Sequence, residues 1–273
     1  MRERVSEAEW ELRVNLAACY RLVAKYGMTD LIYNHITARV PGPQHHILIS
    51  GYGMLYEEVS ASSLIKVDLA GNIVEKPDHG YSVNAAGYII HSAVHEARED
   101  AQCVVHTHTP AGISVSAMEE GLLPLSQTAM RFHGHLAYHE YEGPAFNRGE
   151  KQRLVGHLGA HNAMILRNHG LLACGPSIPQ AFNTIYWLEQ ACRIQVQLLS
   201  CQRPLHRAQP EVVALTAEAL SGMEITLDNE AATNPAFNPA VKRDAQKAGS
   251  GYGLLEWPTL LRSLDRIDKS YRD

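Results

Sequence analysis

The strongest constraint on the fold comes from short apolar segments that are separated by turn residues. Apolar runs of this length between turns are typical of strands, since helices need longer periodic segments. The residues Pro41-Gly42-Pro43 join the first two segments, and Ala70-Gly71-Asn72 join the next two as a hairpin. We therefore expect strands within IYNHITARV and HHILISG and within residues 64–68, 73–75, 102–106, 163–166 and 171–174.

Helix signals lie between these segments. Ser6 and Glu9 have the spacing of a capping box, in which each side chain satisfies a backbone donor of the other residue. Pro110 follows Thr109, and proline is well tolerated in the first turn of a helix. We expect helices from Ser6 to about Gly27, over residues 83–97, after Thr109, and from Ser177 to about residue 201.

Composition argues against several partners and locations. The chain has 24 Lys and Arg against 29 Asp and Glu, so its formal charge of −5 offers no basic surface for nucleic acid. No segment approaches the roughly 20 apolar residues of a membrane span, and no apolar run follows the charged N-terminal residues as in a signal peptide. The five cysteines form no close pairs, which indicates buried free thiols such as Cys103 and Cys174. We therefore expect a cytoplasmic protein.

The C-terminal part of the chain differs from the rest. Residues 203–273 contain five prolines, and the run NEAATNPAFNPAVKRDAQKAGSGYG has little periodicity. We expect one domain over residues 1–205 and an extension over 206–273 that ends in a short helix in WPTLLRSLDRID. The extension could pack on the domain or on a neighbouring subunit, and a surface tail is an equally good interpretation.

The clearest chemical signal is the pair His106 and His108 at the end of an apolar strand. Alternate strand residues project to the same side, so two imidazoles could converge on one cation. His169 is the best third candidate, because it lies in a tight turn between two apolar strands. Three histidines with one open position are typical of a catalytic metal site for Zn, Fe or Mn. The alternative is that these histidines only hydrogen-bond the backbone.

A second histidine cluster comprises His133, His135 and His139. In an extended segment the three would alternate onto one face. His133 is a candidate acid or base, and the neighbouring Arg131 could hold a substrate carboxylate. An exposed strand with polar residues on its wet face explains the cluster equally simply.

Two further segments are candidates for substrate binding. Ser50-Gly51-Tyr52-Gly53 forms a loop after a predicted strand, and its backbone N–H groups could hold an anion or a carbonyl oxygen. Asn34 lies just before the first hairpin and could donate a hydrogen bond to a substrate. Both segments could equally be turn residues.

The chain resembles the class II aldolase/adducin family over roughly residues 10–205, and it is closest to the adducin head domain and its bacterial relatives. The segments that carry the resemblance are YNHITARVPG, ILISGYGMLYEEVSASSLIKVDLAGNIVE, CVVHTHTPAGISVSAMEEGLLPLSQ, HLAYHEYEG and NAMILRNHGLLACG. The resemblance implies an α/β fold, a three-layer α/β/α sandwich around a mostly antiparallel sheet. It also implies a homotetramer with active sites between subunits.

The same resemblance implies site residues. The family's divalent metal ligands map onto His106, His108 and His169, with one ion per subunit. A substrate-binding Asn maps onto Asn34, and the loop that helps to bind phosphate maps onto Ser50 to Gly53. In family enzymes the metal polarises a carbonyl or hydroxyl and stabilises an enediolate during aldol cleavage, epimerisation or decarboxylation.

The chain also departs from the family pattern. Sugar-phosphate aldolases carry Ser-Ser-Glu where this chain has Ala85-Ala86-Gly87, so neither the phosphate-binding serines nor the acid/base Glu are present. A substrate carboxylate could use the space left by the Glu, with the metal and Arg131 as counter-charges. The C-terminal residues LLRSLDRIDKSYRD lack the Lys-rich segment of animal adducins, so actin or spectrin binding is not expected.

Three functions are consistent with these residues. The first is a Zn-dependent carbon–carbon lyase, aldolase- or decarboxylase-like, that acts on a small hydroxy-carbonyl or hydroxy-carboxylate compound. The second is a non-catalytic adducin-like binding module, which the missing Glu would explain. The third is an oxygenase that uses iron or manganese on the same three histidines.

Overall fold

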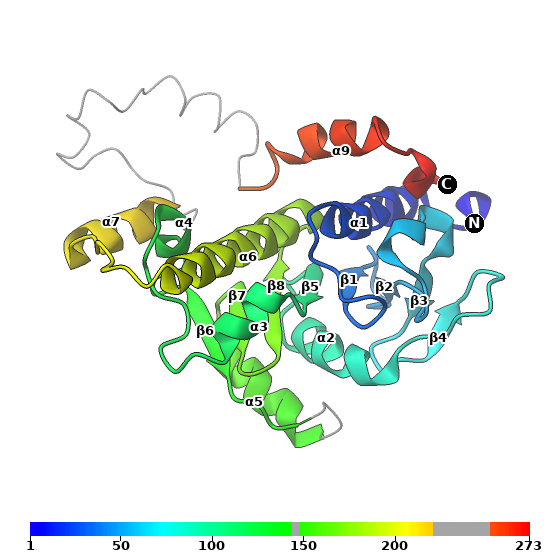
Figure 1. The fold of residues 1–273 in the computed structure, drawn as a ribbon. Helices are drawn as coiled ribbons and strands as arrows, with labels where there is room; N and C mark the ends of the chain where they lie inside the picture. Colours follow the sequence, from blue (N-terminus) through cyan, green and yellow to red (C-terminus); the bar gives the residue numbers. More distant parts are fainter. Residues whose placement is uncertain (144–147, 221–251) are drawn as a thin grey trace, which may run out of the picture.

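The computed structural model describes residues 1–143, 148–220 and 252–273, and its centre is a single sheet (Figure 1). Within these residues the sheet has eight strands in the order β4-β3-β2-β1-β5-β8-β7-β6. All neighbouring pairs are antiparallel except β6 and β7, so the predicted mostly antiparallel sheet is confirmed. The strands are β1 (His35–Arg39), β2 (Ile47–Ile49), β3 (Ile65–Val67), β4 (Ile73–Glu75), β5 (Cys103–Thr107), β6 (Leu136–His139), β7 (Ala163–Leu166) and β8 (Gly170–Gly175).

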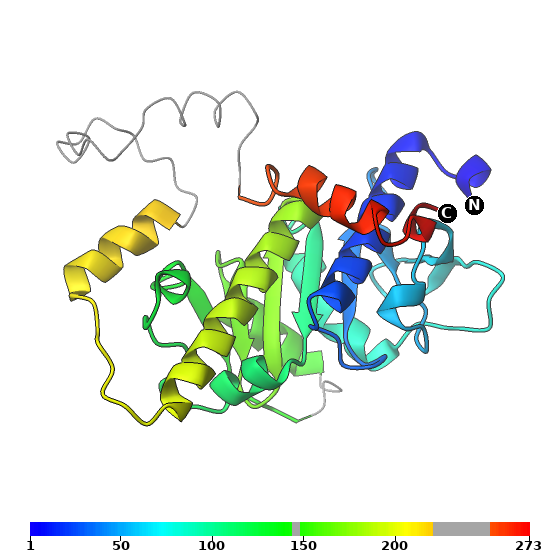
Figure 2. The same ribbon diagram turned by 45° about the horizontal axis from the view of Figure 1, so that its top comes forward.

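Helices cover both faces of the sheet and complete the predicted three layers (Figures 1 and 2). One face carries α1 (Glu7–Lys25), α3 (Pro110–Ser116) and α6 (Ile178–Ser200), and the other carries α2 (Ala85–Ala97) and α5 (Arg148–Leu158). Ser6, Thr109 and Ser177 cap α1, α3 and α6 as expected. The remaining elements are α4 (Gln127–Met130), α7 (Pro210–Leu220), α9 (Trp257–Asp265), η1 (Arg2–Arg4), η2 (Tyr56–Glu58), η3 (Ala61–Ser63) and η5 (Ser270–Arg272).

Side-chain alternation along the strands divides the core in two. In β5, Cys103 and Val105 pack into the cluster formed with α1 and α6, whereas Val104 packs into the cluster formed with α2 and α5. His106 lies two residues after Val104 in the strand, so its side chain projects to the same, α2-covered face. This alternation determines which helices surround the histidine.

The start of α1 differs from the predicted capping box. Ser6 accepts a hydrogen bond from the Glu9 backbone as expected, but the Glu9 carboxylate does not return to Ser6. It instead accepts hydrogen bonds from Arg13 Nε at 2.9 Å and Lys66 Nζ at 2.7 Å. Glu9 and Arg13 are buried. Leaving a buried charge unpaired costs more free energy than leaving out the second hydrogen bond of a capping box, so the Glu9 carboxylate pairs with the two cations. The interaction ties α1 to β3.

The C-terminal residues pack against α1. The indole N–H of Trp257 donates to Asn15 at 2.7 Å, and Arg21 pairs with Asp268 at 3.1 Å. Figure 2 shows α9, in orange and red, lying across the top of α1. The expected short helix is therefore present as α9, whereas most of the run NEAATNPAFNPAVKRDAQKAGSGYG lies outside the described residues.

Among the described residues, no helix is both long enough and apolar enough to cross a membrane. All five cysteines are free, and four of them are buried, including Cys103 and Cys174. The expectation of buried free thiols at these two positions is confirmed.

Replacing Arg13 with alanine should lower the free energy of unfolding by about 3–5 kcal/mol. The guanidinium is fully buried, donates to the Leu64 carbonyl at 2.9 Å, and pairs with Glu9 and Glu75, each of which would lose one of its cationic partners. Urea denaturation measures the effect. Arg2→Ala is the control, because Arg2 is 65% exposed and should cost less than about 1 kcal/mol. Equal losses for the two variants would contradict a structural role of the buried cluster.

Candidate metal centre

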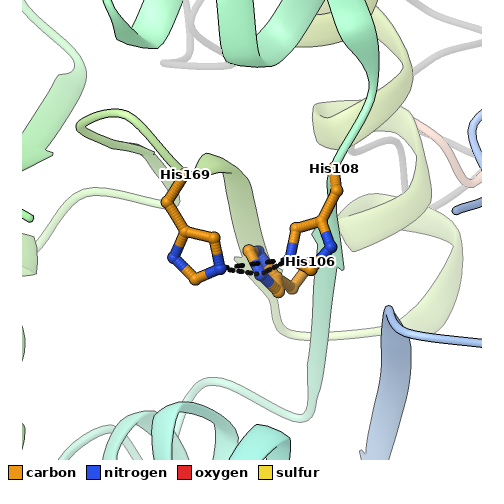
Figure 3. A group of neighbouring side chains, drawn as sticks. All are labelled: His106, His108 and His169. Atoms are coloured by element: carbon orange, nitrogen blue, oxygen red, sulfur yellow. Dashed lines mark hydrogen bonds between the residues drawn. The ribbon is translucent and has the colours of Figure 1, made fainter. Parts of the chain in front are cut away.

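Three imidazole rings meet at one point at the end of β5 (Figure 3). The Nε2 atoms of His106 and His108 are 2.8 Å apart, those of His108 and His169 are 3.1 Å apart, and those of His106 and His169 are 3.3 Å apart. A tetrahedral Zn²⁺ with bonds of about 2.0–2.1 Å places its ligand nitrogens about 3.3 Å apart. The spacing is therefore close to that of a three-histidine metal site.

The pairing of β5 with β8 brings the rings together. Thr107 pairs with Leu171, so His108 and His169 emerge on either side of the same ladder. A Cβ on Gly170 would lie 2.3 Å from the Thr107 carbonyl oxygen, so only glycine allows this approach. Asn168 has a φ of 53°, which Asn tolerates better than most residues and which turns the chain into β8.

The outer nitrogens of two rings face acceptors. His106 Nδ1 donates to the Leu171 carbonyl at 2.8 Å, and His108 Nδ1 donates to the Asp30 carboxylate at 3.1 Å. Each ring is therefore protonated on Nδ1 and, when neutral, has a lone pair on Nε2. Such hydrogen bonds on the outer nitrogen orient metal-binding histidines and raise their basicity.

Burial favours the neutral form of two of the three rings. Burial lowers the pKa of His106 well below its ordinary value and lowers the pKa of His169 to about 4. His106 Nε2 therefore presents a lone pair to Nε2 of His108, which lies 2.8 Å away. A cation at the meeting point would accept lone pairs from the three Nε2 atoms. The residues present therefore fit a divalent metal, and neutral imidazole suits Zn, Fe or Mn.

Asp30 was not identified from the sequence. It lies in the loop between α1 and β1, and Asn34 supports this loop by accepting from the Asp30 backbone and donating to the Met28 carbonyl, both at 3.1 Å. Asn34 is 2% exposed, so its amide positions the loop that carries Asp30. The structure thus gives Asn34 a supporting role rather than an open face toward the histidines. Only the pairing of β1 with β5 brings Asp30 to His108.

The loop from Ser50 to Gly53 lies at the same end of the sheet as the histidines, because β2 and β5 both run antiparallel to β1. The N–H groups of Ser50 and Tyr52 donate to Tyr20 Oη and the Ser82 carbonyl. Gly53 has a φ of 111°, a conformation that favours glycine. In the described chain, the N–H groups of Gly51 and Gly53 have no such partner and remain candidates for binding an oxygen.

Arg131 and His133 lie at the other end of the sheet. Both precede the first residue of β6, whereas His169 follows the last residue of the parallel strand β7. Arg131 donates to Asn183 at 3.3 Å, and its guanidinium lies 5.1 Å and 4.8 Å from the ring centroids of Trp187 and Tyr252. Within one chain, neither residue reaches the three histidines.

The expected alternation of His133 and His135 on a strand is wrong. The two residues lie in a turn in which His133 N donates to Met130 O and His135 N donates to Phe132 O. Gly134 has a φ of 76°, which a strand does not allow. Of this histidine cluster only His139 is in a strand, at the end of β6.

Comparisons with known proteins find relatives over most of the chain. Residues 14–196 match the family described as Class II Aldolase and Adducin N-terminal domain. A protein of Pseudomonas aeruginosa whose name places it in aldolase class 2 is 45% identical over 269 residues, which cover 98% of this chain and 95% of the relative. Alpha-adducin of Rattus norvegicus is 50% identical over 190 residues, or 69% of this chain and 26% of adducin.

Solved structures give the same assignment. An aldolase II superfamily protein from Pseudomonas syringae superimposes with a TM-score of 0.85 and 45% identity, over 100% of this chain and 99% of that one. An L-fuculose 1-phosphate aldolase from Glaciozyma antarctica superimposes with a TM-score of 0.70 and 29% identity, over 78% of this chain and 82% of that one.

Replacing Asp30 with asparagine should weaken binding of a divalent metal by about 10- to 100-fold, because the carboxylate orients His108. Competition with a chromophoric zinc chelator measures the affinity. Asp78→Asn changes an exposed carboxylate and serves as the control. Unchanged affinity in Asp30→Asn would contradict the orienting role.

Proposed function

We propose that this chain, which belongs to the family of class II aldolases and adducin N-terminal domains, is a metal-dependent lyase. Its substrate would be a small hydroxy-carbonyl or hydroxy-carboxylate compound. The observation that carries the proposal is the convergence of three imidazoles through their Nε2 atoms, which lie 2.8 to 3.3 Å apart. Three histidines leave an open position for a substrate oxygen.

One divalent ion per subunit, zinc in our proposal, would act as a Lewis acid that polarises a substrate carbonyl or hydroxyl. His106, His108 and His169 would hold it. Leu171 and Asp30 keep the rings of His106 and His108 in the required tautomer and orientation. The N–H groups of Gly51 and Gly53, at the same end of the sheet, would bind another oxygen of the substrate.

A specific observation also favours a second candidate, a non-catalytic adducin-like module. Alpha-adducin shares 50% identity over 190 residues, and Ala85-Ala86-Gly87 provide no carboxylate at the start of α2. The two candidates differ in whether a metal-loaded protein transforms a small molecule. By family similarity we further propose that the chain forms a homotetramer. The four buried cysteines of each chain are free thiols, which is consistent with our proposal of a cytoplasmic location.

Histidine replacement tests the ligand assignment. Zinc content, measured by mass spectrometry on protein purified without added metal, should be about one ion per chain in the wild type. It should fall below a tenth of that in His106→Ala and in His169→Ala. His206→Ala removes an exposed histidine and should leave the content unchanged. Zinc retained in both ligand variants would refute the assignment.

Acidification tests the environment of the ligands. Because burial depresses the pKa of His106 and brings that of His169 to about 4, protons should displace the metal only as the pH falls toward that value. Zinc should remain bound at about pH 5.5, where a site of exposed histidines with ordinary pKa values of about 6.5 would already be losing it. Dialysis at stepped pH, with circular dichroism to follow folding, measures the release. A release midpoint near pH 6.5 would contradict the prediction.

A substrate screen distinguishes the two candidates. The zinc-loaded wild type is incubated with small hydroxy ketones, hydroxy aldehydes and hydroxy acids, and cleavage or decarboxylation is followed by NMR. We expect turnover that His106→Ala abolishes. Stoichiometric zinc without turnover of any compound would favour the non-catalytic module, and oxygen consumption would indicate an oxygenase.

A further inference from the structure

A second group of polar residues lies beside His169, in a narrow recess between β6, β7 and α5. Its lining includes His139, Tyr141, Glu150, Arg167 and His169. Glu150 is 7% exposed and His139 is 3% exposed. The recess thus brings together a buried carboxylate and a candidate metal ligand, whereas Ala85-Ala86-Gly87 supply no carboxylate.

Both buried residues present an unused polar atom. Among the residues that the structure describes, Glu150 Oε2 and His139 Nε2 are buried and have no hydrogen-bond partner. An unpaired polar atom costs free energy when it is buried, so such atoms in a recess favour a function that supplies a partner. A substrate group or a transferred proton would supply one here.

Two imidazoles lie between Glu150 and solvent. Glu150 Oε1 lies 3.7 Å from His139 Nε2, and His139 Nδ1 lies 2.9 Å from Nδ1 of His157. His157 is exposed on α5. The two imidazoles thus lie in series between the carboxylate and bulk water, and the 3.7 Å step from Glu150 to His139 has to shorten to hydrogen-bond distance for a proton to pass.

We propose that Glu150 is the acid/base residue of the metal centre and that His139 and His157 exchange its proton with solvent. The inference rests on the proposed function. The recess is also bordered by Ile90 on α2, three residues beyond Gly87. The carboxylate that α2 does not provide would thereby come from α5, which packs against α2.

Two arrangements of protons fit the same atoms. In one, Glu150 is protonated, His139 Nε2 has a lone pair, and His139 Nδ1–H donates to His157 Nδ1. In the other, the Glu150 proton has moved to His139 Nε2, the Nδ1 proton has moved to His157, and His157 has released its Nε2 proton to water. The difference between them is one proton transferred from Glu150 to solvent. The deprotonated carboxylate of Glu150 can then accept a proton from the substrate.

The surroundings favour the arrangement with a protonated Glu150. Burial raises the pKa of Glu150, and Glu142 adds to this effect whereas Arg153 opposes it. Burial lowers the pKa of His139, and His157 adds to this effect whereas Glu142 and Glu140 oppose it. Arg167 and His169 are the other titratable groups that face the recess, together with Tyr141.

The test follows proton abstraction itself. Zinc-loaded full-length protein is mixed with hydroxyacetone or dihydroxyacetone in D₂O, and NMR measures the exchange of the C–H protons beside the carbonyl. Glu150→Gln should slow exchange by about 100-fold or more with unchanged zinc content. Glu96→Gln is the matched control, because this exposed carboxylate on α2 pairs with Lys151, the neighbour of Glu150 on α5, and lies outside the recess.

A second variant tests the proton transfer through His139. His139→Ala should slow exchange about tenfold, and added imidazole should restore part of the rate because it replaces the missing proton carrier. Imidazole should not restore Glu150→Gln, and the wild type with imidazole controls for binding of imidazole to zinc. A merely structural role of His139 would give no such rescue and would overturn its part in the path.

A second readout does not depend on activity. Infrared difference spectra between the wild type and Glu150→Gln follow the carboxyl group directly as the pH is raised. We expect protonated Glu150 to persist above the ordinary range of glutamate, and a midpoint at or below this range would overturn the proposal.

The outcomes separate the two levels of inference. Equal exchange by the wild type and Glu150→Gln would overturn the role of Glu150 and leave the metal-dependent function intact. A zinc-loaded wild type that exchanges neither ketone would overturn this inference, while the cleavage and decarboxylation screen decides the proposed function separately.

Discussion

The candidate site depends on one close contact, that of the Thr107 carbonyl with the α-carbon of Gly170. A side chain at Gly170 would separate β5 from the turn that precedes β8, since its Cβ would lie 2.3 Å from the carbonyl oxygen. Without this ladder His106 and His108 would end one strand while His169 occupied a distant loop. The ladder also places the Leu171 carbonyl where His106 Nδ1 donates to it. A single strand pair thus determines both the position and the tautomer of a ring.

Polar groups surround this contact on the α2 face of the sheet. Thr37 lies 2.7 Å from His91 Nδ1 and 2.8 Å from His95 Nε2, and His95 Nδ1 donates to the Ala101 carbonyl at 3.0 Å. Burial lowers the pKa of His91 well below the ordinary value and that of His95 to about 3, so both rings are neutral. The α2 face of the sheet therefore combines an apolar cluster with neutral imidazoles that are hydrogen-bonded behind the site.

Much of the fold follows from local patterns, and the exceptions have physical causes. Turn residues and caps locate most helices and strands, because they act through neighbouring backbone groups. His133 and His135 were misplaced because the positive φ of Gly134 breaks the strand pattern before β6 begins. Glu9 was misassigned because its competing partners, Arg13 and Lys66, are brought together only by packing. Local rules fail where a distant charge offers a stronger interaction.

The sequence by itself determined the three histidines, their spacing, the family and the absence of the usual Ser-Ser-Glu at residues 85–87. These depend on residue type and on strand geometry over a few positions. Only the tertiary structure revealed Asp30 behind His108, placed Arg131 at the far end of the sheet, and brought Glu150 and His139 beside His169. The reason is that these contacts join residues on different strands and helices. Their distances are set by the order and direction of strands, which no single segment of the chain encodes.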